Sequence, residues 1–168
     1  MLHVLGGERN LKPSESEVID TVEDVVGQTT DTRYDLFFTT TKVIAAIVLH
    51  PSDLSKVYTK RTRLEELVIG GAIQRREVQA LSTNLQNDRR QGFKNKTPNE
   101  IISTHRANLE IFYENVLSAK VGKGLFGARL EFDAYVINGT RKFKFQLHAA
   151  QFEKVRRLLN LTLPGKVV

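Results

Sequence analysis

The chain has 168 residues, of which 40% are apolar and 26% charged, and these values exclude wholesale disorder and collagen-like repeats. It has no cysteine, which excludes disulfides, thiolate metal sites and cysteine nucleophiles. The net charge of +6 is uneven: residues 1–53 carry four Lys and Arg against nine Asp and Glu, residues 54–106 carry eleven against five, and residues 107–168 carry ten against five.

Neither a membrane span nor a signal peptide is expected. The apolar runs 43–49 and 67–73 are far shorter than the roughly 20 residues that cross a bilayer. Residues 1–10 lack the charged start and the apolar centre of a signal peptide. We therefore expect a cytoplasmic protein.

Strand signals dominate residues 17–49. Residues 17–26 are rich in β-branched side chains, which favours a strand. Two apolar, β-rich runs follow at 33–38 and 42–49, separated by three threonines. These runs predict a hairpin whose two strands lie centrally in a sheet.

Helical spacing replaces this pattern after Pro51. Ser52 or Asp53 is a suitable helix cap, and apolar residues then recur every three or four positions. The glycine pair at 70–71 breaks this helix or packs it tightly, and a second helical pattern covers residues 73–85. The sequence therefore predicts two consecutive helices.

A polar, basic connector is expected at residues 92–96, followed by a short helix. Thr97, Pro98 and Glu100 have the arrangement of a capping box with a proline in the first turn. We expect this helix to end near Arg106.

The C-terminal third alternates between apolar and polar residues, as an antiparallel sheet does. Asn138-Gly139 is a preferred pair for a two-residue type I′ turn. Taking this pair as the loop places Phe132 opposite Phe145 on an apolar face and leaves charged residues on the other face. Residues 107–112 and 117–121 are two further expected strands.

The last predicted element is an amphipathic helix over residues 148–160. Phe152, Val155, Leu158 and Leu159 share one face of it, and charged residues lie opposite. The apolar face is expected to cover the sheet.

Gly122, Gly124 and Gly127 spell G-x-G-x-x-G, the spacing found where a backbone approaches a dinucleotide. In such a site a helix follows and its N-terminus holds the phosphates. Here an alternating strand pattern follows, so we predict a glycine-rich β-turn instead.

Candidate catalytic and metal-binding groups are scattered along the chain. The histidines His3, His50, His105 and His148 have no metal-ligand spacing, and no nucleophile elbow or P-loop motif occurs. Folding could still gather His50, Glu100 and His105 into one site. We predict a non-enzymatic protein with no cofactor and no metal.

Basic side chains gather in the predicted helical region, where they are candidates for binding anions or lipid head groups. They are Lys56, Lys60, Arg61, Arg63, Arg75 and Arg76. The aromatic residues near the basic clusters are Tyr58 and Phe93, too few for a base-stacking platform, so nucleic acid is a disfavoured partner.

Segments 33–49 and 111–132 resemble two patterns of the prokaryotic pleckstrin-homology-like (bacterial PH) domain family. The first is an apolar strand, a threonine turn, a basic residue and a second apolar strand. The second is a tyrosine-containing lead, an apolar strand, a small-residue turn and another strand. The resemblance implies a strongly bent antiparallel sheet, or a partly open barrel, capped by the C-terminal helix. It also implies a non-enzymatic scaffold that is often oligomeric.

We therefore predict a mainly-β α+β fold in a single domain over residues 1–168. Its core is expected at about residues 15–50 and 98–162, with a helical insertion at about 53–97. Seven or so short strands and a terminal amphipathic helix suit a bent sheet, and closure of such a sheet hides exposed strand edges.

Two functional hypotheses follow. The first is a binding or assembly module that self-associates or contacts a protein partner through the apolar stripe of the insertion, although this stripe could instead pack on the chain's own sheet. The stripe comprises Leu54, Val57, Leu64, Leu67 and Val68. The alternative hypothesis is peripheral attachment to an anionic membrane through the basic cluster named above.

Overall fold

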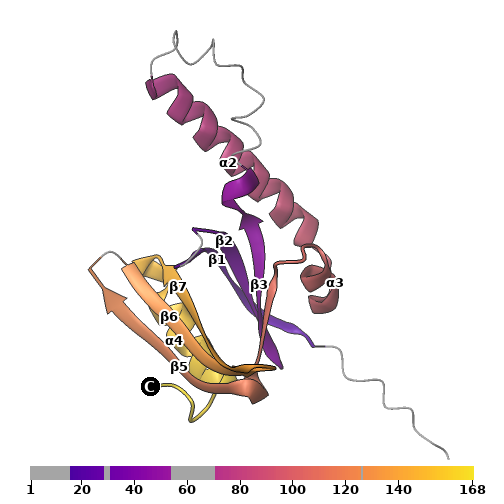
Figure 1. The fold of residues 1–168 in the computed structure, drawn as a ribbon, viewed down its shortest axis with the longest axis vertical. Helices are drawn as coiled ribbons and strands as arrows, with labels where there is room; N and C mark the ends of the chain where they lie inside the picture. Colours follow the sequence, from indigo (N-terminus) through magenta and orange to yellow (C-terminus); the bar gives the residue numbers. More distant parts are fainter. Residues whose placement is uncertain (1–15, 29–30, 54–70, 126) are drawn as a thin grey trace, which may run out of the picture.

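The computed structural model describes residues 16–28, 31–53, 71–125 and 127–168, with the backbone alone for residues 71–77. In these residues, seven strands form one antiparallel sheet, the C-terminal helix lies against it, and a second long helix contacts it at one end and projects beyond it (Figure 1). This arrangement confirms the predicted mainly-β α+β class. The strands are β1 (Val18–Gly27), β2 (Arg33–Thr39), β3 (Lys42–Leu49), β4 (Leu109–Phe112), β5 (Val116–Gly124), β6 (Gly127–Val136) and β7 (Gly139–Leu147). The helices are α2 (Gly71–Phe93), α3 (Pro98–Ser103) and α4 (Phe152–Thr162).

The strand order in the sheet is β4-β3-β2-β1-β7-β6-β5. β1 joins the two halves, because Val26 and Gly27 at its end pair with Gln146 and Phe145 of β7. Apolar side chains of β2, β3, β6 and β7 meet in one core, where the rings of Tyr34 and Phe145 lie 5.9 Å apart, edge to face. The sheet therefore curves around a core that both halves share.

The terminal helix α4 covers this core, as its amphipathic pattern predicts. Val155, Leu158 and Leu159 are buried in the main core, and Phe152 packs against it half-buried. Figure 1 shows α4 lying across the strands β5, β6 and β7. Burying three branched side chains contributes on the order of 5 kcal/mol to the hydrophobic stabilisation of the fold.

β3 is buried along its whole length, which explains why its sequence is continuously apolar after Lys42. Val43, Ala45 and Ile47 join the main core. Their neighbours Ile44, Ala46 and Val48 point to the opposite face and form a second, smaller core with Phe93 of α2 and Ile101 of α3. A strand covered on both faces reads as continuously apolar instead of alternating.

The helix α2 is inserted between β3 and β4 and packs on the sheet at its C-terminal end (Figure 1). Phe93 is 9% exposed and its ring meets that of Phe37 edge to face at 5.7 Å. The predicted polar connector therefore begins at Lys94 and not at residue 92, because Phe93 supplies the last apolar contact of the helix. Among the helices that the structure describes, none is both long and apolar enough to span a bilayer.

The boundaries of the shorter helical elements were predicted in part. The capping box of Thr97 and Glu100 is present at the start of α3, although α3 ends at Ser103 and not near Arg106. Residues 51–53 are already helical, so the helix starts one residue after His50 and not after Ser52 or Asp53. The Asp53 carboxylate accepts the His50 N–H at 2.9 Å, which accounts for the earlier start.

The β6–β7 hairpin differs from the prediction by two positions. Val136 pairs with Gly139 and Phe132 with Phe143, so Ile137 and Asn138 form the loop. Gly139, with a φ of 125°, begins β7 instead of closing the turn. A shift of two residues keeps every side chain on its face, so the predicted apolar and charged faces are confirmed although the register was wrong.

The G-x-G-x-x-G motif lies in the β5–β6 hairpin, as predicted. β5 ends at Gly124 and β6 begins at Gly127. Gly127 has a φ of 132°, and a Cβ there would come within 2.5 Å of the Leu147 carbonyl oxygen. The last glycine of the motif therefore allows close strand packing.

Candidate binding face

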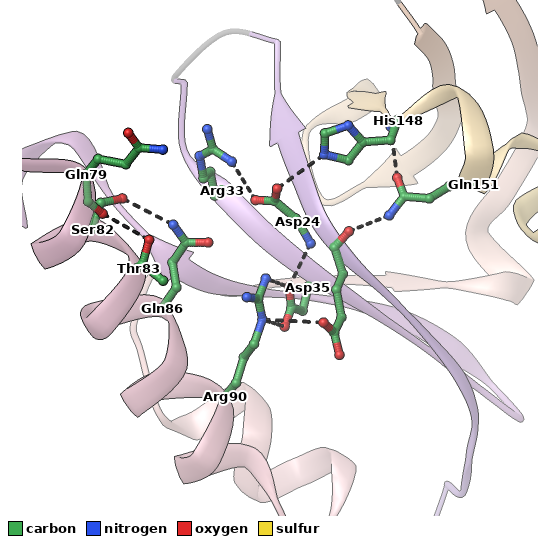
Figure 2. Close-up of polar contacts among 11 residues, drawn as sticks. Asp24, Arg33, Asp35, Gln79, Ser82, Thr83, Gln86, Arg90, His148 and Gln151 are labelled. Atoms are coloured by element: carbon green, nitrogen blue, oxygen red, sulfur yellow. Dashed lines mark hydrogen bonds and ion pairs between the residues drawn. The ribbon is translucent and has the colours of Figure 1, made fainter. Parts of the chain in front are cut away.

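A chain of polar contacts runs from α2 across β2 and β1 to the start of α4 (Figure 2). Its centre is Asp35 of β2, which is 2% exposed. The Arg90 guanidinium of α2 donates to both carboxylate oxygens of Asp35, at 2.8 and 2.9 Å. This hydrogen-bonded pair raises the pKa of Arg90 above its usual value. The pair fixes α2 to the sheet.

The second centre of this network is Asp24, at a register irregularity of β1 where φ is 56°. Its backbone N–H donates to Asp35 at 2.9 Å, and its carboxylate accepts from Arg33 at 2.6 Å. His148, just before α4, lies 3.2 Å from the same carboxylate. Burial by itself raises the pKa of Asp24, but the contacts with Arg33 and His148 outweigh it and hold the pKa below its usual value.

Arg90, Arg33 and His148 each contact a carboxylate of this network. The Gln151 side chain extends the network, because it accepts the backbone N–H of His148 at 2.9 Å and donates to the Glu23 carbonyl at 2.6 Å (Figure 2). We therefore assign these residues to holding α2 and α4 on the sheet.

An open groove of about 690 Å³ lies elsewhere, along the outer edge of β4. We call it the edge groove. One wall is residues 108–112 and the other is residues 134–138 at the tip of the β6–β7 hairpin, with Arg141 and Phe143. Four apolar side chains on these walls are exposed, among them Ile137, which is fully exposed. They are Phe112, Tyr135, Val136 and Ile137.

Backbone groups of β4 also face the edge groove. β4 is the end strand of the sheet, paired on one side with β3. The Tyr113 N–H donates to the Thr41 carbonyl at 3.0 Å. This bond shows which residues of β4 direct their backbone groups toward β3, because such residues alternate along an antiparallel strand. Residues 109, 111 and 113 therefore point their N–H and C=O groups at β3, whereas Glu110 and Phe112 point theirs away from it.

A second hollow, of about 400 Å³, adjoins the edge groove and shares Leu109, Arg141 and Phe143 with it. We call it the basic hollow. Its lining includes His50, Lys142 and Lys144 besides Arg141, and no carboxylate lines it in the part of the chain that the structure describes. The Arg141 guanidinium lies 4.9 Å from the centre of the Phe143 ring, and Lys142 pairs with Asp133 at 3.5 Å.

The structure describes no side chain of the residues predicted for self-association and anion binding. Among the described residues, Arg75 and Arg76 are placed on α2 by backbone only. The others lie outside the described residues: Lys56, Lys60, Arg61 and Arg63 of the basic cluster, and Leu54, Val57, Leu64, Leu67 and Val68 of the apolar stripe. Whether the stripe packs on the sheet or is free for a partner stays a prediction.

Sequence reasoning missed the edge groove, although a signal for it exists. Tyr135, Val136 and Ile137 are three consecutive bulky apolar residues at a hairpin tip, where polar residues are the rule. The other wall, β4, was predicted as a strand, but its place at the end of the sheet depends on the topology.

No cluster of three or more His, Asp and Glu side chains suited to a metal ion occurs among the described residues. Glu100 is engaged in the α3 capping box, and His50 and His105 line different hollows. In comparisons with known proteins, no family model, curated protein or solved structure matches the chain. The candidate site is therefore defined by its geometry.

Proposed function

We propose that the chain is a non-enzymatic binding module of pleckstrin-homology-like architecture that contacts a protein partner through the edge groove. The architecture is supported by the strand order, in which β1–β4 and β5–β7 each pair in sequence and β1 connects the two halves. It is also supported by the amphipathic helix α4, which follows the last strand and covers the shared core.

Two features of the described residues carry the binding role. The outer edge of β4 pairs with no described strand, and exposed apolar side chains lie beside it. Unpaired N–H and C=O groups of an edge strand are available to pair with another chain. Exposed apolar patches rimmed by polar residues mark interaction sites more often than chance allows. In the edge groove both features occur together, at β4 and at the tip of the β6–β7 hairpin.

A binding role also suits the interior of the fold. Phe132 and Phe145 are fully buried and meet edge to face at 6.5 Å between ring centres, so aromatic side chains fill the space inside the curved sheet. Side chains that fill a small barrel leave little room for an internal substrate site. Recognition is therefore assigned to the surface.

The test is selection of peptides from a random display library, followed by affinity measurements with two matched variants. Ile137 and Leu125 are both almost completely exposed residues at hairpin tips, but Leu125 does not line the edge groove. We expect Ile137→Asp to weaken binding of the selected peptides about tenfold or more, while Leu125→Asp leaves it unchanged. Failure to enrich any peptide, or equal binding by both variants, contradicts the proposal.

A further inference from the structure

We infer that the edge groove and the basic hollow together take an extended acidic segment of a partner protein, which adds to the sheet as a strand beside β4. This inference rests on the proposed function and specifies the chemistry of the partner. The backbone of the segment pairs with Glu110 and Phe112, and its carboxylates lie in the basic hollow.

The backbone part of the inference follows from the geometry of β4. Glu110 and Phe112 present N–H and C=O groups on the same side, about 7 Å apart along the strand. An added strand satisfies these groups without any rearrangement of the sheet, as in other complexes formed by strand addition. Apolar side chains of that strand then contact Val136 and Ile137 on the opposite wall of the edge groove.

The side chain of Glu110 does not oppose an acidic partner. Its carboxylate is paired with the Lys42 ammonium, which also lies 5.2 Å from the centre of the Phe112 ring. This pair neutralises the acidic residue on the β4 wall.

The charge of the partner follows from the basic hollow. The hollow opens at the Leu109 end of the edge groove and is lined by Arg141 and Lys144, together with Lys142, whose ammonium is paired with Asp133. No carboxylate is among its described lining residues. A segment that continues past Leu109 therefore places its side chains beside several cations. Complementary charge steers association and excludes partners of the same sign.

This charge argues against a second copy of the chain as the occupant. Two copies joined symmetrically at this surface would bring their basic hollows together, with the same sign of charge on both sides. The backbone groups of β4 distinguish a peptide from an anionic membrane as the partner. A membrane can attract the exposed lysines, but a bilayer surface offers no backbone to pair with Glu110 and Phe112.

The experiment uses fluorescence anisotropy with a blocked, labelled peptide in which alternating Val and Thr residues precede a run of Glu. We expect it to bind about tenfold or more tightly than the same peptide with Gln in place of Glu, and more weakly as salt is raised. Methylating alternate backbone nitrogens of the acidic peptide should weaken binding about fivefold for each hydrogen bond removed. Both changes leave the protein untouched.

Protein variants locate the contacts. The combined substitution Arg141→Glu and Lys144→Glu should abolish the preference for Glu over Gln, whereas Lys120→Glu on β5, an exposed residue outside both hollows, should keep it. Equal binding of the Glu and Gln peptides, or no effect of backbone methylation, overturns the inference.

Library peptides that require Ile137 but are neutral or basic would leave the proposed function standing and reject the acidic partner. Binding to phosphatidylserine vesicles without binding to the peptide rejects both in favour of a membrane.

Discussion

Asp24 is the residue at which three elements of the fold meet. Its left-handed backbone conformation, with a φ of 56°, turns the N–H toward Asp35 of β2 and leaves the carboxylate between Arg33 and His148 (Figure 2). Asp and Asn adopt this conformation more readily than other non-glycine residues. One residue thereby links the irregularity of β1 to the start of α4.

Asp24→Asn tests this role through its dependence on pH. The pKa of Asp24 is lower in the fold than the value of 3.8 of the free side chain, so the ionised form stabilises the fold. That contribution is complete above the unfolded pKa and is lost as the pH falls through the folded pKa. Because the carboxylate is partly exposed, we expect the Asn variant to lose about 1 kcal/mol of unfolding free energy at neutral pH.

Denaturant unfolding of both proteins between neutral pH and about pH 2 measures the difference. The two unfolding free energies should converge below about pH 4, as the wild-type carboxylate becomes protonated. A difference that stays constant over the whole range contradicts an electrostatic role for Asp24. Asn is chosen because it retains the shape of Asp and tolerates the same φ.

At the scale of elements, α2 is held on the sheet by a buried ion pair and an aromatic contact. Arg90 binds Asp35, and Phe93 meets Phe37. Removing one partner of a buried ion pair leaves the other charge without compensation, which costs more than the pair contributes as a whole. The contact between Arg90 and Asp35 is therefore a sensitive point of the α2 attachment.

Asp35→Ala should lower the unfolding free energy by about 2–4 kcal/mol. The substitution leaves the Arg90 guanidinium without its carboxylate partner and removes the acceptor of the Asp24 backbone N–H. The matched control is Asp133→Ala on β6, whose pair with Lys142 has exposed side chains on both partners. This control should lose less than about 1 kcal/mol. Chemical denaturation of the two variants side by side gives the comparison, and equal losses would contradict a special role for Asp35.

The sequence predicted several elements well because their signals are local. The capping box at Thr97 and the apolar stripe of α4 involve residues within a few positions of one another. The β6–β7 register failed because Asn138-Gly139 is a strong turn signal that the longer pairing of β6 with β7 overrides. The two-sided burial of β3 could not be assigned to particular partners, since Phe93 and Ile101 are distant from it in sequence.

At the scale of the whole molecule, the candidate site depends on the path of the sheet. The meander places β4 at one end, and the β6–β7 hairpin returns beside it across the edge groove. The two walls, residues 108–112 and 134–138, carry no shared sequence motif. The fold class was therefore predictable from pattern and resemblance, whereas this site required the arrangement in space.

The central claim is that a partner pairs with the outer edge of β4, and amide hydrogen exchange read residue by residue by NMR tests it most directly. In the free protein the N–H groups of Glu110 and Phe112 should exchange rapidly, while that of Ile111, which faces β3, should be protected. Addition of a library-selected peptide should slow exchange at Glu110 and Phe112 and leave Ile111 as it was. Unchanged exchange at both residues in the presence of saturating peptide would contradict the account.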